Sequence, residues 1–132
     1  MADMDPTGGL WNWAAAASLP AERVHGALAG ALERNVGPLE SGSAVLCDVY
    51  HVGGDFPTVI DVYLAPETLA ESTAASAVAV RLGVEIVLPD DSLDPSAYVL
   101  AGPDGGLRDV RIDETETDAG TERRLRRDRP AA

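Results

Sequence analysis

The amino-acid sequence predicts a single α+β domain, with helices packed on one face of a mainly antiparallel sheet and the element order α-α-β-β-α-β-β-β. Three observations support this prediction. Apolar residues recur with a helical period over residues 20–35 and 66–82. They alternate with other residues over residues 45–50, 59–64 and 107–112, as in half-buried strands. Turns rich in glycine and proline separate these segments, and 132 residues suffice for one domain.

The N-terminal part of the chain predicts two helices after a flexible arm. Residues 1–9 contain one proline and two glycines, which favour a loose arm. Residues 10–17 are mostly apolar and can form a short helix, to which Trp11 and Trp13 give bulk. Pro20 suits the first turn of the next helix. The apolar face of that helix is formed by Val24, Leu28, Ala31 and Leu32.

A β-hairpin is predicted in the middle of the chain. Residues 45–50 and 59–64 each alternate with a period of two. Between them, Gly53, Gly54 and Asp55 form a compact turn, which favours antiparallel pairing of the two stretches. In the second stretch, the side chains expected to face the core are Ile60, Val62 and Leu64.

The second half of the chain predicts a helix, three strands and a tail. The helix over residues 66–82 ends at Gly83. Residues 113–132 show no apolar periodicity, and acidic residues give way there to arginines, which predicts a disordered tail. The expected strands span residues 84–88, 97–101 and 107–112. The predicted organisation is a flexible arm over residues 1–9, a domain over residues 10–112 and a tail over residues 113–132.

The charge balance favours a basic protein as the partner. Twenty-two acidic residues oppose ten basic residues, and all ten are arginines. Residues 1–122 carry 21 acids and 5 arginines, whereas residues 123–129 carry five arginines and one aspartate. A body this acidic repels phosphate backbones, so we expect no nucleic-acid binding. We expect no membrane partner either, because no stretch approaches the roughly 18 apolar residues that a membrane helix needs.

The cysteine content predicts a cytoplasmic protein. Cys47 is the only cysteine, so no internal disulfide can form, which fits a reducing compartment. The apolar residues 13–19 resemble part of a signal peptide, but acidic residues precede them where such a peptide carries basic ones.

No recognisable catalytic or metal-binding motif is present, and we expect neither a cofactor nor enzymatic activity. Cys47 and His51 share one face of a predicted strand, but at about 3.3 Å per residue they lie roughly 13 Å apart. That separation is too large for a thiolate–imidazole pair. His25 has no acid at a recognisable spacing, and two histidines do not make a metal site by themselves.

The densest group of potential oxygen ligands lies in one loop, at Asp90, Asp91, Ser92 and Asp94. Alternate oxygens match the start of a calcium-binding loop, but Pro95 occupies the position at which such a loop needs glycine. Three interpretations stay open: solvated loop acids, an acidic protein-binding patch, or a cation site.

Acidic residues on turns and on outer strand faces are the candidate partner-binding residues. Asp48 and Asp61 lie on the predicted outer face of the hairpin, where Tyr50 and Tyr63 can flank them. Tyrosines beside carboxylates suit the recognition of arginine or lysine through cation–π and charge contacts. The complete candidate set is Asp48, Tyr50, Asp55, Asp61, Tyr63, Asp90, Asp91 and Asp94.

The order of elements from Leu82 to Ile112 supplies a resemblance to a known class. A helix ending in Leu82-Gly83 is followed by a strand, an aspartate-rich loop, a strand, the turn Pro103-Asp104-Gly105 and a further strand. Together with the acidic body, residues 20–118 resemble the small immunity proteins of bacterial toxin systems. The resemblance implies a stoichiometric inhibitor whose surface acids cover the cationic active site of a toxin.

Two alternatives remain from other functional classes. The chain also resembles acidic secretion chaperones, which bind an unfolded segment of a client protein. The third interpretation is a small enzyme subunit that uses the loop around Asp90.

Overall fold

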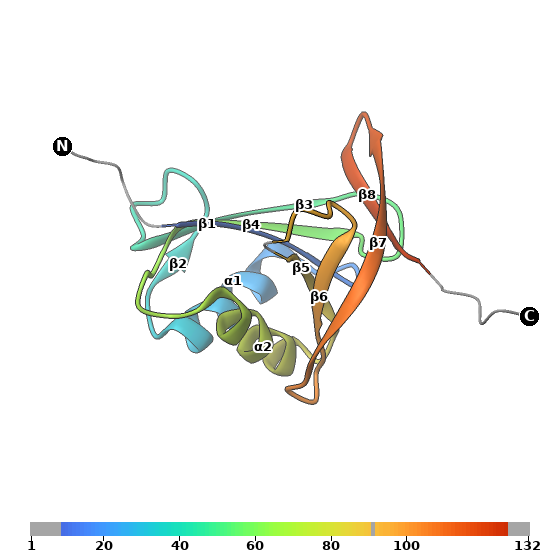
Figure 1. The fold of residues 1–132 in the computed structure, drawn as a ribbon. Coiled ribbons are helices and arrows are strands. Elements are labelled where there is room, and N and C mark those ends of the chain that lie inside the picture. Colours follow the sequence, from blue (N-terminus) through green and yellow to red (C-terminus); the bar gives the residue numbers. More distant parts are fainter. Residues whose placement is uncertain (1–8, 91, 127–132) are drawn as a thin grey trace, which may run out of the picture.

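The structure is a computed structural model that describes residues 9–90 and 92–126 (Figure 1). Within these ranges the chain forms eight strands and two helices. Their bounds are β1 (Gly9–Ala15), α1 (Ala21–Leu32), β2 (Val36–Gly37), β3 (Val45–His51), β4 (Thr58–Ala65), α2 (Glu71–Leu82), β5 (Ile86–Pro89), β6 (Ala97–Ala101), β7 (Leu107–Thr117) and β8 (Gly120–Leu125).

The predicted fold class and element order are wrong, because the chain is dominated by strands. The observed order is β-α-β-β-β-α-β-β-β-β, and the strands follow one another as β2-β3-β4-β1-β5-β6-β7-β8 across the sheet. Residues predicted as the first helix form β1, between β4 and β5. Trp13 and Ala14 on successive positions of β1 are both fully buried. A strand covered on both faces has an almost continuous apolar sequence, which imitates a short buried helix.

The predicted disordered tail is also wrong over residues 113–125. Strand β7 continues to Thr117, and β8 pairs with it antiparallel, with Ile112 opposite Leu125 and Thr117 opposite Gly120. The periodicity was hidden because polar residues occupy much of the inward side, as at Arg123, which is only 6% exposed. Residues 127–132 of the predicted tail lie outside the described residues, as do residues 1–8 of the predicted arm.

The predicted hairpin in the middle of the chain is confirmed. Strands β3 and β4 pair antiparallel from Leu46 opposite Tyr63 to His51 opposite Thr58. Leu64 departs from the expected core position, because a bulge between β1 and β4 leaves it outside the register and 40% exposed. Its φ of 61° lies in the left-handed region, which is uncommon for a residue other than glycine.

The larger core lies between the two helices and one face of strands β1, β3, β4 and β5. Figure 1 shows α1 and α2 together on that side of the strands. Trp11 and Trp13 point into this core and stack with ring centroids 5.3 Å apart. Both helices end in a left-handed residue, Glu33 and Gly83, whose backbone N–H bonds to the last turn. Neither helix has the length and apolar character needed to cross a membrane.

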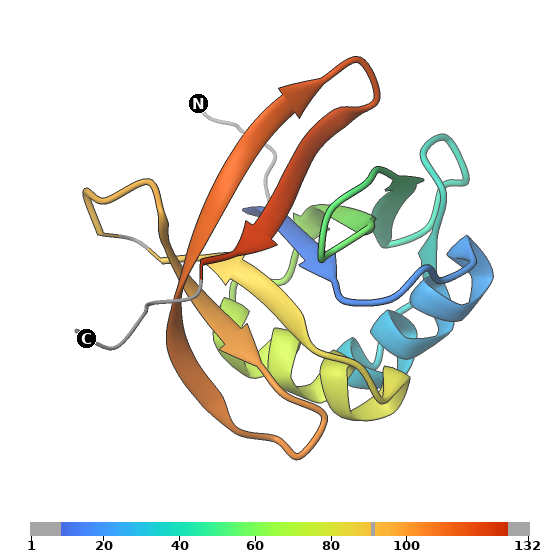
Figure 2. The same cartoon turned by 90° about the vertical axis from the view of Figure 1, so that its right-hand side faces the viewer.

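A smaller second core lies on the opposite face of the sheet. The sheet curls from β5 to β8, so that the β7–β8 hairpin runs across the direction of β1 and β4 (Figures 1 and 2). Its buried members come from four strands and the β3–β4 turn: Ala14, Phe56, Val87, Tyr98, Leu100 and Ile112. The sheet therefore has a covered second face, unlike the half-solvated sheet that the sequence predicted.

The edge of β8 docks against the β3–β4 turn and closes this second core. Gly54 forms a bridge with Arg123, and the Asp55 N–H donates to the Arg123 carbonyl at 2.8 Å. The Leu125 N–H donates to Asp55 Oδ2 at 2.8 Å. Gly54 has a φ of 91°, and a Cβ there would lie 2.7 Å from the Arg123 carbonyl oxygen. Only glycine fits this close approach without displacement of the backbone.

We expect β8 to be essential for stability. A chain that ends at Asp118 loses the β7–β8 ladder and uncovers Tyr98 and Ile112 in the second core. Compared with a chain that ends at Arg126, its free energy of unfolding should fall by more than about 3 kcal/mol. Urea denaturation of the two chains measures the difference. Equal denaturation midpoints would show that β8 is not part of the cooperative fold.

Candidate functional site

Four of the predicted partner-binding residues share one face of the β3–β4 hairpin. Asp48 stands directly opposite Asp61, and Tyr50 and Tyr63 each lie two positions further along their strands. Side chains two residues apart on a strand point to the same face. All four residues are half-buried. We call this set, Asp48, Tyr50, Asp61 and Tyr63, the acid–tyrosine face.

Within the described part of the chain, no basic side chain forms an ion pair with either carboxylate of the acid–tyrosine face. Asn12 on β1 is opposite Asp61 and donates from Nδ2 to Asp61 Oδ1. Asp48 makes no hydrogen bond and no ion pair with the described residues. Like charges directly opposite each other on neighbouring strands are destabilising. The arrangement therefore favours a bound positive charge.

The negative charge of the two carboxylates acts on the pKa of the neighbouring tyrosines. Burial raises the pKa of Tyr63, and Asp61 and Asp48 raise it further. Burial and Asp61 likewise raise the pKa of Tyr50, with Arg123 acting in the opposite direction. Both phenols therefore stay neutral at physiological pH and present hydroxyl groups and ring faces beside the carboxylates.

Arg123 of β8 lies beside this face and is the buried cation of the second core. Its Nη2 donates to Asn12 Oδ1 at 2.9 Å, and its Nε donates to the Tyr98 hydroxyl at 3.2 Å. Its Nη1 donates to the Thr121 carbonyl at 3.3 Å. No carboxylate of the described residues lies within ion-pair distance of Arg123.

Two neutral side chains connect Arg123 to acids. Asn12 binds Arg123 through its oxygen and Asp61 through its nitrogen. The Tyr98 hydroxyl accepts a hydrogen bond from Arg123 and donates a hydrogen bond to Glu114 Oε2. Burial and the hydrogen bond to Glu114 raise the pKa of Tyr98, while Arg123 lowers it. The Arg123 guanidinium is thus linked indirectly to two carboxylates, to Asp61 through Asn12 and to Glu114 through Tyr98.

Sequence reasoning missed Asn12, Tyr98, Glu114 and Arg123 as parts of this network. A signal was present in the last stretch, where Thr121, Arg123 and Leu125 alternate with Glu122 and Arg124. This is a strand period, but with an arginine at the central inward position it does not stand out as one.

Asp55, which was predicted to contact a partner, has a structural role in the fold. Its carboxylate accepts from the Leu125 N–H, and its N–H bonds to the carbonyl of Arg123. The residue therefore holds β8 against the β3–β4 turn.

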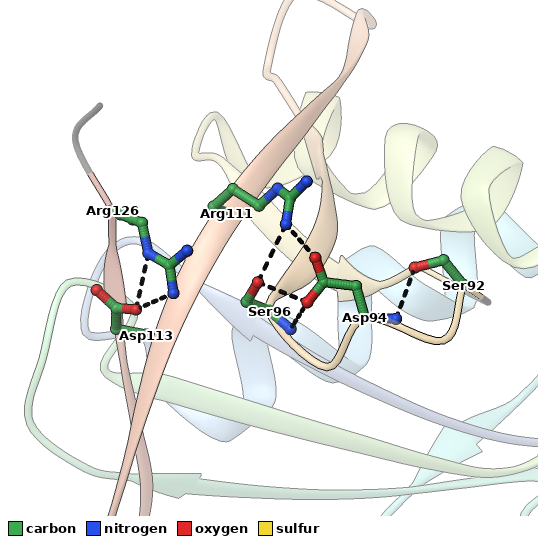
Figure 3. A network of polar contacts seen from close by, with 6 residues as sticks. All are labelled: Ser92, Asp94, Ser96, Arg111, Asp113 and Arg126. Carbon is green, nitrogen blue, oxygen red and sulfur yellow. Dashed lines mark hydrogen bonds and ion pairs between the residues drawn. The ribbon is translucent and has the colours of Figure 1, made fainter. Parts of the chain in front are cut away.

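The acidic loop before β6 is organised by its own hydrogen bonds. Asp94 accepts from the Ser96 N–H at 2.9 Å and the Ser96 hydroxyl at 2.8 Å, and it forms an ion pair with Arg111 (Figure 3). The Ser96 N–H, then its hydroxyl, lower the pKa of Asp94, with Arg111 adding to the effect. Asp90 accepts from the Ser92 N–H at 3.1 Å.

Among the described residues, no hydrogen bond or ion pair joins this loop to the acid–tyrosine face, so the predicted site residues divide into separate groups. Asp91 lies outside the described residues. In the described ranges no cluster of three or more His, Cys, Asp or Glu side chains is placed to hold a metal ion.

Cys47 and both histidines act in packing and backbone capping. The Cys47 side chain is fully buried between α1 and the sheet. His25 Nε2 donates to the Cys47 carbonyl at 3.1 Å, and His51 Nε2 donates to the Leu19 carbonyl at 2.7 Å. These bonds satisfy one backbone carbonyl of β3 and one of the segment between β1 and α1.

No family model, curated protein or solved structure matches this chain.

We expect Arg123 to contribute more to stability than its neighbour Arg124. An Arg123→Gln substitution removes a buried charge and leaves Asn12 and Tyr98 without their donor, so it should cost about 2–4 kcal/mol of unfolding free energy. The matched control is Arg124→Gln, since Arg124 is exposed and forms a surface ion pair with Glu122 at 3.2 Å. The control should cost less than about 1 kcal/mol. Equal losses in thermal or urea denaturation would contradict the buried role of Arg123.

We also expect the Cys47 thiol to be unreactive in the folded protein. Burial, followed by the charges of Asp48 and Asp61, raises its pKa to about 12. The thiolate is the reactive form, so a thiol-specific reagent at neutral pH should modify Cys47 only after denaturation. Rapid modification of the native protein would show that this part of the core opens.

Proposed function

We propose that this protein is a non-catalytic acidic binding protein, and that it neutralises a basic bacterial toxin by stoichiometric binding, as immunity proteins do. The acid–tyrosine face is the proposed binding surface, and the partner's arginine or lysine side chains are the groups it binds. The proposal places the protein in the cytoplasm, where its single thiol stays reduced.

The observation that carries the proposal is the opposed pair Asp48 and Asp61, flanked by Tyr50 and Tyr63 on one sheet face. The pair destabilises the free protein, and a cation bound between the two carboxylates would relieve that cost. The tyrosine rings add a surface on which a guanidinium or ammonium group can stack.

Apolar surface next to the acid–tyrosine face supports a protein as the partner. Leu10 on β1 stands opposite Tyr63 and is 63% exposed. The bulge at Leu64 displays a second leucine, 40% exposed, next to Tyr63 in the chain. A few aromatic and apolar contacts beside charged groups are typical of the residues that dominate binding energy in protein interfaces.

The charge of the whole molecule supports rapid capture of a basic partner. The formal net charge is −12, and complementary charge raises association rates and makes them sensitive to salt. Neither the binding of a basic partner nor its rapid capture requires a catalytic group. The buried Cys47 thiol offers no accessible nucleophile.

The test is an Asp48→Asn substitution, which should stabilise the protein and weaken its function. Removal of one of two opposed charges should raise the unfolding free energy by about 0.2–1 kcal/mol at neutral pH. Loss of one member of a desolvated charge pair costs about 2–5 kcal/mol of binding, so affinity for the toxin should fall roughly 30-fold or more.

An immunity protein is expected to be encoded beside its toxin, so the partner to be measured is the product of the adjacent gene. Glu67→Gln is the matched control, because it removes one charge from an exposed position outside the face. Calorimetry should give one partner molecule per chain, and association should slow as salt is added. Unchanged affinity of the Asp48→Asn variant, or salt-independent association, would contradict the proposal.

A further inference from the structure

Strand β7 has a side of its backbone without a partner strand over residues 107–110. Strand β6 pairs with residues 107–111 of β7, whereas β8 pairs with residues 112–117. On the side of residues 107–110 that faces away from β6, residues 9–90 and 92–126 supply no partner strand.

Two hydrogen bonds show which backbone groups point to this open side. The Ile112 N–H donates to the Ser96 carbonyl at 2.9 Å, toward the β6 side, and the Arg126 N–H donates to the Arg111 carbonyl at 2.8 Å, toward the β8 side. In an antiparallel ladder the backbone groups of successive residues point to alternate sides. Asp109 has the same orientation as Arg111, so its N–H and C=O point to the open side.

An open groove of about 630 Å³ borders this stretch of β7. It is lined by residues 108–111, Leu125 and Arg126, and also by Ala97 and Tyr98 of β6 and by Asp90, Ser92 and Asp94 of the acidic loop before β6. Val110 and Leu125 both pack against the second core, so the groove is continuous with an apolar surface. Arg108 lies 3.8 Å from Glu85, and its side chain is 62% exposed. Its guanidinium is accessible to a further carboxylate.

We propose that an extended segment of a partner protein adds to β7 at this groove as an antiparallel strand, in line with β8. The N–H and C=O of Asp109 supply the main-chain bonds of such strand addition. The side chains of β7 define the segment, because cross-strand pairs favour opposite charges and apolar contacts. It carries an apolar residue opposite Val110, a basic residue opposite Asp109 and an acidic residue opposite Arg108.

The C-terminal sequence of this chain is a poor match to the same edge. Continuing the β7–β8 register would set Asp128 opposite Asp109 and Arg129 opposite Arg108, which are both pairs of like charge. Pro130 would follow and has no N–H to donate. The pattern of charges on β7 therefore favours a different chain.

The groove is lined by β6, β7, the loop before β6 and residues 125–126, whereas the acid–tyrosine face lies on β3 and β4, so the two proposals stand independently.

The experiment measures amide hydrogen exchange by NMR in the full-length protein, with two synthetic peptides as probes. The first peptide is Thr-Thr-Val-Lys-Glu-Val-Thr-Thr with blocked ends, which places lysine opposite Asp109 and glutamate opposite Arg108. The second has lysine and glutamate exchanged and is otherwise identical. At saturation the first peptide should slow exchange of the Asp109 N–H about tenfold or more, and the second should bind more weakly.

Two variants separate the main-chain bond from the side chain. Asp109→Pro removes the N–H that faces the open side, and Asp109→Ala removes the same carboxylate but keeps the N–H. The alanine variant should still bind the first peptide, and the proline variant should not. The proposal is overturned if the Asp109 N–H of the free protein already exchanges slowly, if neither peptide protects it, or if both peptides protect it equally.

Discussion

The second half of this fold depends on one buried guanidinium. Arg123 is held through Asn12 of β1 and Tyr98 of β6, two strands that are separated by β5 in the sheet. A buried charge is tolerated only where its hydrogen bonds are satisfied. The sheet must therefore curl until β8 brings Arg123 between these two partners. The same curl covers the apolar residues of the second core. One geometry therefore satisfies the hydrogen bonds of Arg123 and buries these apolar side chains.

Strand β1 connects the two cores, because its alternate side chains enter them separately. Trp11 and Trp13 point toward the helices, while Asn12 and Ala14 point toward the β7–β8 hairpin. Asn12 couples Arg123 to Asp61 and hence to the acid–tyrosine face. The position of the hairpin and the charge on the proposed binding face are consequently linked through a single amide side chain.

The positive charges of the described residues are concentrated near the β7–β8 hairpin. Of the eight arginines in the described residues, five lie within residues 107–126. The hairpin region thus provides most of the local positive charge in an acidic protein, and Arg111 and Arg126 each pair with an aspartate (Figure 3). Asp48 and Asp61 have no such arginine partner within residues 9–90 and 92–126. The contrast distinguishes acids that stabilise the fold from the acids that we propose bind another protein.

The sequence by itself determined the local elements whose pattern is set by near neighbours. The β3–β4 hairpin follows from alternation on both sides of Gly53 and Gly54, and its register places Asp48, Tyr50, Asp61 and Tyr63 on one face. Tertiary structure alone decided the conformation of β1 and β8. An apolar run such as residues 10–17 is compatible with a helix or a doubly covered strand, and only the neighbours β4 and β5 select the strand. An arginine in the middle of a polar stretch predicts a solvent-exposed position. Only the fold brings Arg123 to its distant hydrogen-bond partners. Asn12 is separated from Arg123 by 111 positions in the chain, and such long-range pairings leave no local pattern in the sequence.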